Sequence, residues 1–375
     1  DVIDAADGDD PFDLRANVEF RRSLRRTKIT REFACGAREF ANEPADPCPT
    51  APEYGKLLHV KELRFQRVVQ ELVPTLRFGL WHDLELLLEA PIVLSNEQEV
   101  RFAGNGGDRA GTIITPENST VAPGNGAHLF EVPPAGLPSR AGFGDMLFML
   151  RYSPVSQERD AQRGTWTLEV GYRAPTGEAM KAGSENVGRG VHELILSTGL
   201  SHRFNYVEPY VRFRYVKPYA AKGSLFKNYG GQEEFEGPGH RMRFDLGAEF
   251  IPFHDNESGA KFYIDLGFSG QYQAKGRDYS ELFDALGMAG QGCKNGFSQA
   301  EKNVDDRGLP NVACFNPDSS SEARGLPHDG ITTVDPFVSV QMRFAGGIYV
   351  SDHAKIGGSL SIAHDTEHFI SNASV

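Results

Sequence analysis

The residues nearest to a catalytic pattern lie close to the C-terminus. His364-Asp-Thr-Glu-His368 matches H-x-x-E-H, in which two His ligands and a Glu serve metalloproteases. That chemistry needs both His on one face of a helix, whereas this motif continues an alternating run, 355–363, that predicts a strand. We therefore expect polar strand-end residues and no proteolysis. A metal or hydrogen-bond cluster on the loop side is the alternative.

A nucleophilic site has no better support. Ser201, His202 and His192 lie near one another in the sequence, but no G-x-S-x-G nucleophile elbow is present. We expect no catalytic residue, no enzyme activity, no cofactor and no resident metal. The net charge of −12 argues against a nucleic-acid partner, because such partners are bound by basic surfaces.

The four cysteines fall into two local pairs, Cys35 with Cys48 and Cys293 with Cys314. Each pair lies within a predicted long loop, so we expect two disulfides and an oxidising compartment such as the periplasm or the cell surface. A zinc site is the rival interpretation. It is disfavoured because neither pair forms CxxC or has a His at ligand spacing beside it.

Charged residues recur at every second position of the extended segments, and these residues are the candidate functional set. They predict either a pore whose charged walls select solutes or a salt-bridged interior that fills a narrow barrel. The favoured interpretation is a narrow or plugged lumen. The residues predicted to line it are Arg15, Glu19, Arg21, Arg77, Glu85, Glu89, Asp145, Arg151, Glu169, Arg173, Glu193, Glu208, Arg212, Arg214, Arg243, Asp245, Glu249, Asp265, Asp335 and Arg343.

Apolar and charged residues alternate with a period of two, and the strands that this pattern predicts position the charged residues. From Phe12 to Arg21, apolar and charged residues alternate, which places them on opposite faces of a strand. No run approaches the ~18 to 20 apolar residues of a spanning helix, so a membrane protein must cross with strands. Segments with this alternation, about eleven in all, are predicted at 12–21, 56–80, 84–90, 145–152, 166–173, 193–200, 207–215, 242–250, 262–269, 334–344 and 355–362.

The lengths of the predicted connections also alternate, as in outer-membrane barrels with tight periplasmic turns and long external loops. Within the longest loop, residues 279–289 are expected to form a short amphipathic helix over the barrel mouth or against a neighbour. The short links are near 81–83, 155–163, 203–206, 253–259 and 350–353, and the long ones are near 35–55, 100–141, 176–190, 221–239 and 276–332.

Closure of the barrel is the open point of this prediction. Bacterial single-chain barrels usually have an even number of strands, so a twelfth strand is expected, and residues 370–375 do not provide one. We expect a flexible acidic N-terminus, 1–11, and one barrel domain, 12–375, that lacks its last strand. Closure by residues 1–13 or by a partner chain is the alternative. A start at Asp1 suggests an exported protein whose signal peptide has been removed.

Several stretches resemble a known family of barrels. Leu76-Arg-Phe-Gly-Leu-Trp-His-Asp-Leu-Glu-Leu86, Gly142-Phe-Gly-Asp145, Tyr172-Arg-Ala-Pro-Thr-Gly177 and His364–Phe369 resemble, in order and spacing, segments of the phenol meta-pathway degradation (MetA-like) family of outer-membrane proteins. The resemblance implies a barrel of about twelve strands, loosely related to long-chain fatty-acid transporters, that takes up small and often hydrophobic molecules. The cysteine loops and the Asp-rich start have no counterpart in it.

The sequence thus predicts an all-β class: a transmembrane antiparallel barrel of a bacterial outer membrane that passes or binds small solutes. A structural anchor in an envelope or surface assembly is the alternative. The expected partners are outer-membrane lipid and lipopolysaccharide, with envelope or surface proteins in the second case.

Overall fold

The segments in which apolar and polar residues alternate form β-strands in the structure. The computed structural model describes residues 14–34, 57–102, 137–157, 159–160, 162–226, 237–255, 260–285, 330–351 and 354–371. Within these ranges no helix is long and apolar enough to cross a membrane. The strands are β1 (Leu14–Ala34), β2 (Leu57–Trp81), β3 (Leu84–Glu89), β4 (Ile92–Phe102), β5 (Arg140–Phe143), β6 (Leu147–Val155), β7 (Thr165–Arg173), β8 (Val191–Ser201), β9 (Val207–Ala220), β10 (Arg241–His254), β11 (Lys261–Gln273), β12 (Gly276–Asp278), β13 (Thr332–Val334), β14 (Phe337–Ser351), β15 (Ala354–Asp365) and β16 (Ile370–Ser371).

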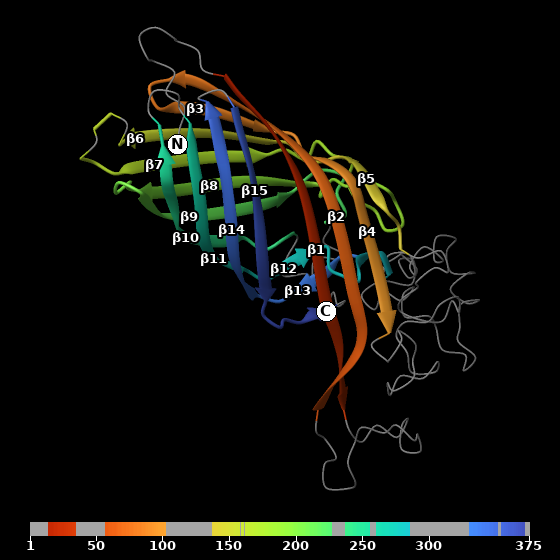
Figure 1. Cartoon of the computed structure of the whole chain (residues 1–375). Coiled ribbons are helices and arrows are strands. Elements are labelled where there is room, and N and C mark those ends of the chain that lie inside the picture. The colour runs from red at the N-terminus through yellow and green to blue at the C-terminus, as the bar shows by residue number, and fades with distance from the viewer. Residues whose placement is uncertain are drawn as a thin grey trace, which may run out of the picture.

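Thirteen of these strands form one antiparallel sheet, which curves into a barrel (Figure 1). Its order is β15-β14-β11-β10-β9-β8-β7-β6-β3-β2, with β4 and β5 continuing beside β2 and with β1 on the other edge of β2. β3 and β4 form one crossing that is interrupted at Pro91, because proline cannot donate to the ladder. β5 and β6 likewise form one crossing. Thirteen strands minus these two interruptions leave eleven crossings, as the alternation predicts.

Connections of two lengths lie at opposite ends of the barrel (Figure 1). At the short-turn end, Asp83 and Asn205 each adopt a φ of 48°, which short polar side chains tolerate better than other residues. The other end carries the long connections, most of which lie outside the described residues.

The two predicted disulfides fall within those long connections and are not tested by the structure. The cysteines concerned all lie outside the described residues, so their pairing stays a prediction: Cys35, Cys48, Cys293 and Cys314. The same holds for the acidic N-terminus, residues 1–11.

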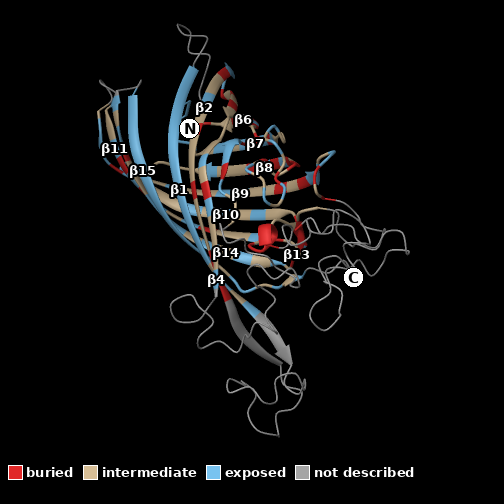
Figure 2. Cartoon of the chain, turned by 90° about the vertical axis from the view of Figure 1, so that its right-hand side faces the viewer, coloured by how far each residue is buried: buried red, intermediate tan, exposed pale blue. Residues whose placement is uncertain are grey.

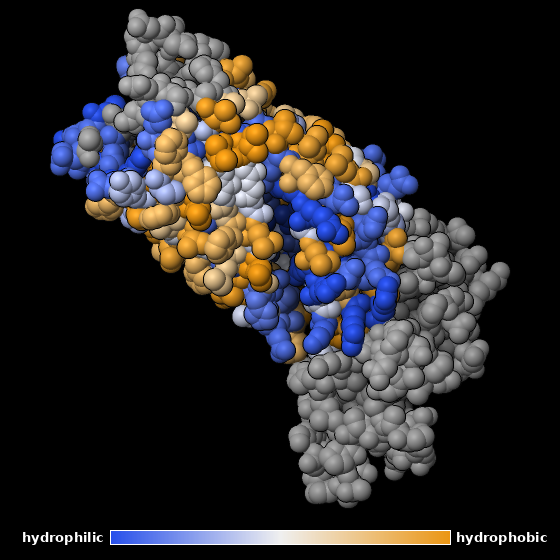
Figure 3. Space-filling view, in the orientation of Figure 1, coloured by the Kyte–Doolittle hydropathy of each residue, from blue (hydrophilic) through white to orange (hydrophobic). Residues whose placement is uncertain are grey.

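The polarity of the barrel is inverted relative to a soluble protein. Leu266 and Ile362 are 50% and 72% exposed, while the carboxylates of Glu85 and Asp265 face inward, at 0% and 6%. Outward apolar side chains cover the strands as an orange band in Figure 3. Exposed apolar area on this scale requires a hydrocarbon environment. The prediction of two faces is confirmed, and the chain folds as a transmembrane antiparallel β-barrel.

A seam separates β1 from β15. Both strands run from the short-turn end to the long-connection end, so they are parallel to each other, and no described strand pairs with their outer edges. They are exposed along most of their described lengths (Figure 2). Arg25 Nη2 on β1 lies 3.3 Å from Asp365 Oδ2 on β15, across the seam. A single strand of the opposite direction would pair with both edges in the antiparallel sense.

Two sequence predictions are corrected here. Val334 and Asp335 do not begin a barrel strand, because Pro336 ends pairing there and β14 begins only at Phe337. Val334 is buried in β13, which belongs to a small separate sheet with β12 and β16. In the segment predicted as an amphipathic helix, helical conformation begins only at Phe283, and residues 286–289 lie outside the described part.

Candidate lumen and the segment at its mouth

A cavity of about 2580 Å³ occupies the barrel and opens at the seam. Its walls come from β1, β7–β11, β14 and β15, whose inward positions carry charged or small polar side chains. Figure 3 shows the hollow between the apolar band and the hydrophilic face of β1. Eleven of the residues predicted to line the lumen line this cavity: Glu19, Arg21, Glu169, Glu208, Arg212, Arg214, Arg243, Asp245, Glu249, Asp265 and Arg343.

One row of ion pairs crosses neighbouring strands of the wall. Strand pairing places Glu85, Arg151 and Glu169 directly opposite one another on β3, β6 and β7. Arg77 Nη2 lies 2.5 Å from Glu85 Oε2, and Arg151 Nε lies 3.1 Å from Glu169 Oε1. Arg214 approaches Glu169 at 3.8 Å. Because both carboxylates are nearly inaccessible to solvent, these pairs hold the wall together.

A second cluster lies towards the long-connection end and centres on Glu193 of β8. Its carboxylate accepts from Arg189 at 2.9 Å and from Arg241 at 2.5 Å, and Arg173 lies 3.3 Å away. Arg189 also binds Asp278 of β12 at 2.9 Å. The Asp278 carboxylate, and then that of Glu193, raise the pKa of Arg189 above its usual value, so this cation is permanent.

Arg214 and Arg243 join two cavities. They are direct neighbours across β9 and β10, and both line the large cavity and a smaller one of about 380 Å³. The smaller cavity is also lined by Asp145, Arg173 and Glu193, three more of the predicted lumen residues. The two residues therefore lie between the two cavities.

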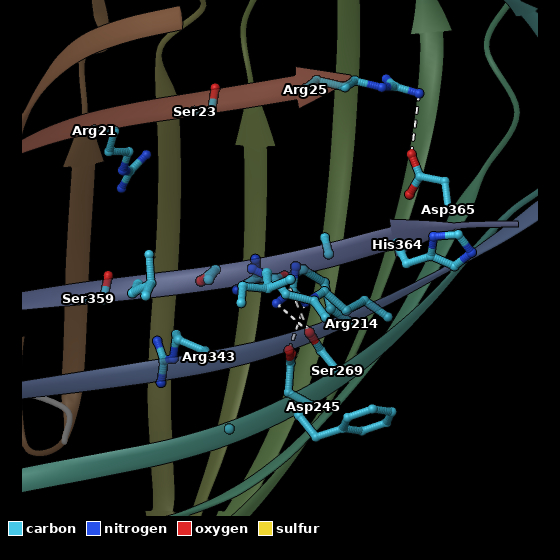
Figure 4. A pocket seen from close by; sticks show the side chains of 18 of the residues that line it. Arg21, Ser23, Arg25, Arg214, Asp245, Ser269, Arg343, Ser359, His364 and Asp365 are labelled. Atoms are coloured by element: carbon cyan, nitrogen blue, oxygen red, sulfur yellow. Dashed lines mark hydrogen bonds and ion pairs between the residues drawn. The ribbon is translucent and has the colours of Figure 1, made fainter. Parts of the chain in front are cut away.

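A third cluster lies on β9, β10, β11 and β14, beside these two arginines. Arg343 Nη2 of β14 binds Asp265 Oδ1 of β11 at 2.9 Å, and both contact the hydroxyl of Tyr210 at 3.2 Å. Arg243 donates from Nε to Asp245 Oδ1 at 2.7 Å and from Nη2 to Ser269 Oγ at 3.0 Å. Figure 4 shows Asp245 and Ser269 close together on the cavity wall. These contacts hold long side chains against the wall and keep the space between them open.

Arg212 differs from the other cavity arginines. Within the described part of the chain, no carboxylate lies within ion-pair distance of it, and its side chain is exposed to the cavity. A cation that forms no close ion pair inside a walled, low-dielectric space raises the local concentration of anions.

The segment 276–285 lies across the mouth of the barrel. Asp284 Oδ1 lies 2.5 Å from Arg140 Nη2 of β5, with both side chains almost wholly buried. Asp284 also accepts from Gly183 N and from Gln98 Nε2, each at 3.1 Å. Glu281 binds Arg25 of β1 at 2.8 Å. This segment therefore connects β1, β4, β5 and the connection 174–190.

An apolar cluster fixes the same segment from the other side. Phe283 packs with Met180, Val191, Phe226 and Ile331, four buried residues that come from the long connections or the start of β8. Because apolar packing and a buried ion pair act together, residues 276–285 form an ordered plug at this position; whether it closes the lumen stays a prediction.

The remaining predicted lumen residues lie outside the two cavities. Arg77, Glu85 and Arg151 belong to the row of buried ion pairs. Glu89 lies 3.8 Å from Arg21 and 3.9 Å from Arg173. Asp335 lies between β13 and β14, 3.4 Å from Lys275, and Arg15 lies on β1 opposite Arg77.

Sequence reasoning missed an apolar row inside the wall. Leu87, Met149, Ile195 and Val216 occupy neighbouring inward positions on β3, β6, β8 and β9 and are buried, with Gly171 of β7 between Met149 and Ile195. It also missed Arg140 and Asp284. Arg25 could have been found, because it continues the inward alternation of Arg21 along β1.

The His motif gives no metal centre. His364 is exposed, and His368 stacks on Phe337 with ring centroids 4.3 Å apart. Asp365 between them binds Ser339 and Arg25. Among the described residues, no group of His, Cys, Asp and Glu is arranged to hold a metal ion.

Comparison with known proteins finds a likeness among solved structures. No protein-family model and no curated protein matches the chain, so the MetA-like resemblance stays a prediction. An outer membrane channel from Pseudomonas putida F1 is similar at 10% identity and a TM-score of 0.38, over 94% of this chain and 95% of that one. A likeness at this level says nothing of the function of this chain.

Proposed function

We propose that the protein is a channel of the bacterial outer membrane that passes small polar solutes. The observation that carries the proposal is the inverted polarity: an apolar belt surrounds a cavity of about 2580 Å³ whose wall is charged. Neither a soluble enzyme nor a nucleic-acid-binding protein needs such a surface.

The wall favours polar over hydrophobic solutes. Met149, on the inward face, is buried within the wall and lines neither cavity, and Ile195 borders only the smaller one. The lining of the large cavity includes Arg212, Glu208 and Tyr210, whose polar groups replace part of the hydration of a polar solute. The space between Arg214 and Arg243, where the two cavities approach each other, limits the size of the solutes that can pass.

Planar-bilayer recording and liposome swelling with neutral sugars and amino acids of increasing size test this function. We expect discrete conductance steps and uptake of the smaller solutes. The double variant Arg214→Ala/Arg243→Ala should raise the conductance and admit larger solutes. Arg101→Ala, on the outer face of β4, is the control and should change neither quantity. Absence of both conductance and uptake in the folded wild-type protein would contradict the proposal.

A second candidate function, a structural anchor in an envelope assembly, is favoured by one observation. β1 and β15 each present an edge that pairs with no described strand, and unpaired backbone groups in a membrane cost several kcal/mol each. A partner that inserted a strand at the seam would satisfy both edges. Stoichiometric co-purification of such a protein, lost when Gly358 at the β15 edge is replaced by Pro, would favour the anchor; purification alone as a conducting barrel would exclude it.

A further inference from the structure

Three cations lie side by side on the outer face of the barrel, beyond the apolar belt. The strand register places Lys28 of β1 opposite Arg64 of β2, and Arg64 opposite Arg101 of β4. All three side chains are exposed. Since directly opposed residues point to the same face, the three form one row, about 10 Å long at ordinary strand spacing. We call them the basic row.

The row points away from the lumen. Along β1, the side chains of Val18, Phe20 and Leu24 share the parity of Lys28 and belong to the exposed apolar set. Along β2, the residues on either side of Arg64, Leu63 and Phe65, are buried on the inner face. The side chains of the basic row therefore lie on the outer face, and only Lys28, on the edge strand β1, also borders the cavity.

Its charge is only partly compensated within the chain. Arg101 pairs with Glu99, but no described carboxylate forms an ion pair with Lys28 or Arg64. Like charges directly opposite on neighbouring strands destabilise a sheet. An external anion that bridged the row would remove that repulsion and would gain charge-assisted hydrogen bonds.

The depth of the basic row relative to the membrane indicates which anion it would meet. Leu24 is the last large apolar residue on the outward face of β1, and Lys28 lies four residues further towards the long-connection end, about 13 Å along the strand. Since strands tilt by about 40°, the row lies about 10 Å beyond the belt, at the depth of lipid headgroups. The long-connection end of such barrels faces the cell exterior, where the outer leaflet carries phosphorylated glycolipid.

We propose that Lys28, Arg64 and Arg101 bind phosphate groups of lipopolysaccharide in the outer leaflet. This rests on the proposed location in the outer membrane, but it is independent of whether the lumen conducts. Two or three cations at strand spacing can contact separate oxygens of one phosphate or two phosphates on adjacent sugars.

The test measures binding of purified lipopolysaccharide to the detergent-solubilised protein by native mass spectrometry. The probes are intact lipopolysaccharide, the same glycolipid after enzymatic dephosphorylation, and phosphatidylglycerol. We expect the wild type to prefer the intact form, and Lys28→Gln/Arg64→Gln to weaken its binding by about tenfold or more. The control Arg163→Gln/Lys222→Gln removes two exposed cations elsewhere and should leave the affinity unchanged.

Heat-modifiable migration of each variant on denaturing gels shows whether the barrel is folded. Bilayer conductance, measured without lipopolysaccharide, separates this proposal from the channel function. Equal binding of intact and dephosphorylated glycolipid would overturn the proposal. So would equal binding of phosphatidylglycerol, which would reduce the basic row to a general attraction for anionic surfaces. The proposal would also be overturned if the control Arg163→Gln/Lys222→Gln lost as much affinity for lipopolysaccharide as Lys28→Gln/Arg64→Gln.

Discussion

Arg140 and Asp284, 144 positions apart in the sequence, form an ion pair of 2.5 Å that fastens the plug to the barrel. Arg140 also donates to the backbone carbonyls of Ser184 and Asn186 and so binds the connection 174–190. A single guanidinium thus holds together a barrel strand, the plug and one long connection. The first prediction concerns this pair.

Asp284→Asn is expected to loosen the plug. It leaves the Arg140 guanidinium buried without its counter-charge, which costs about 3 to 5 kcal/mol for buried pairs. The mean single-channel current should rise, and the open state should become more frequent. Asp160→Asn, which breaks the exposed pair with Arg163 at the short-turn end, should leave the current unchanged. An unaltered current in Asp284→Asn would show that residues 276–285 do not restrict the pore.

Arg212→Gln is expected to shift ion selectivity towards cations. Arg212 has no described carboxylate partner and lines the cavity, so its removal changes the field in the lumen without leaving an unpaired acid. The reversal potential in a salt gradient measures the shift. Arg101→Gln changes the net charge equally, on the outer face, and serves as the control. The same reversal potential in both variants would argue that solutes do not pass Arg212.

Gly171→Val is expected to destabilise the barrel by about 1 to 3 kcal/mol, the usual cost of overpacking. A Cβ atom at Gly171 would lie 3.1 Å from Met149 Cε and 3.2 Å from Ile195 Cβ, inside the apolar row of the wall. Reversible unfolding in lipid vesicles with guanidinium chloride measures the change. Gly270→Val is the matched control, because no described atom lies within 4 Å of its Cβ. Equal stability of the two variants would mean that the inner row is not packed as described.

The sequence predicts the strands because lipid on one side and charge on the other impose a period of two. Glu169 and Leu168 fall on opposite faces for that reason alone. The same reasoning fails where the inner face is also apolar. Met149 and Ile195 break the alternation, and their contact depends on the register between strands, which the sequence of one strand does not contain.

The plug could not be predicted for a different reason. Arg140 and Asp284 lie at the ends of long connections, where no periodicity indicates which way a side chain points. Their pairing requires the folded barrel to bring β5 and residues 276–285 together. The odd number of predicted strands indicates that the barrel has a seam. The contact between Arg25 and Asp365 across it depends on the tertiary structure and could not be predicted.

The account depends on the outward apolar residues facing lipid. The direct measurement is tryptophan fluorescence in vesicles whose acyl chains carry bromine, in a background with Trp81→Phe and Trp166→Phe. The emission of Leu266→Trp, on the outer face of β11, should be strongly quenched, and that of Ser269→Trp, on its inner face, should not be. Quenching at position 269 that equals or exceeds quenching at position 266 would contradict the account.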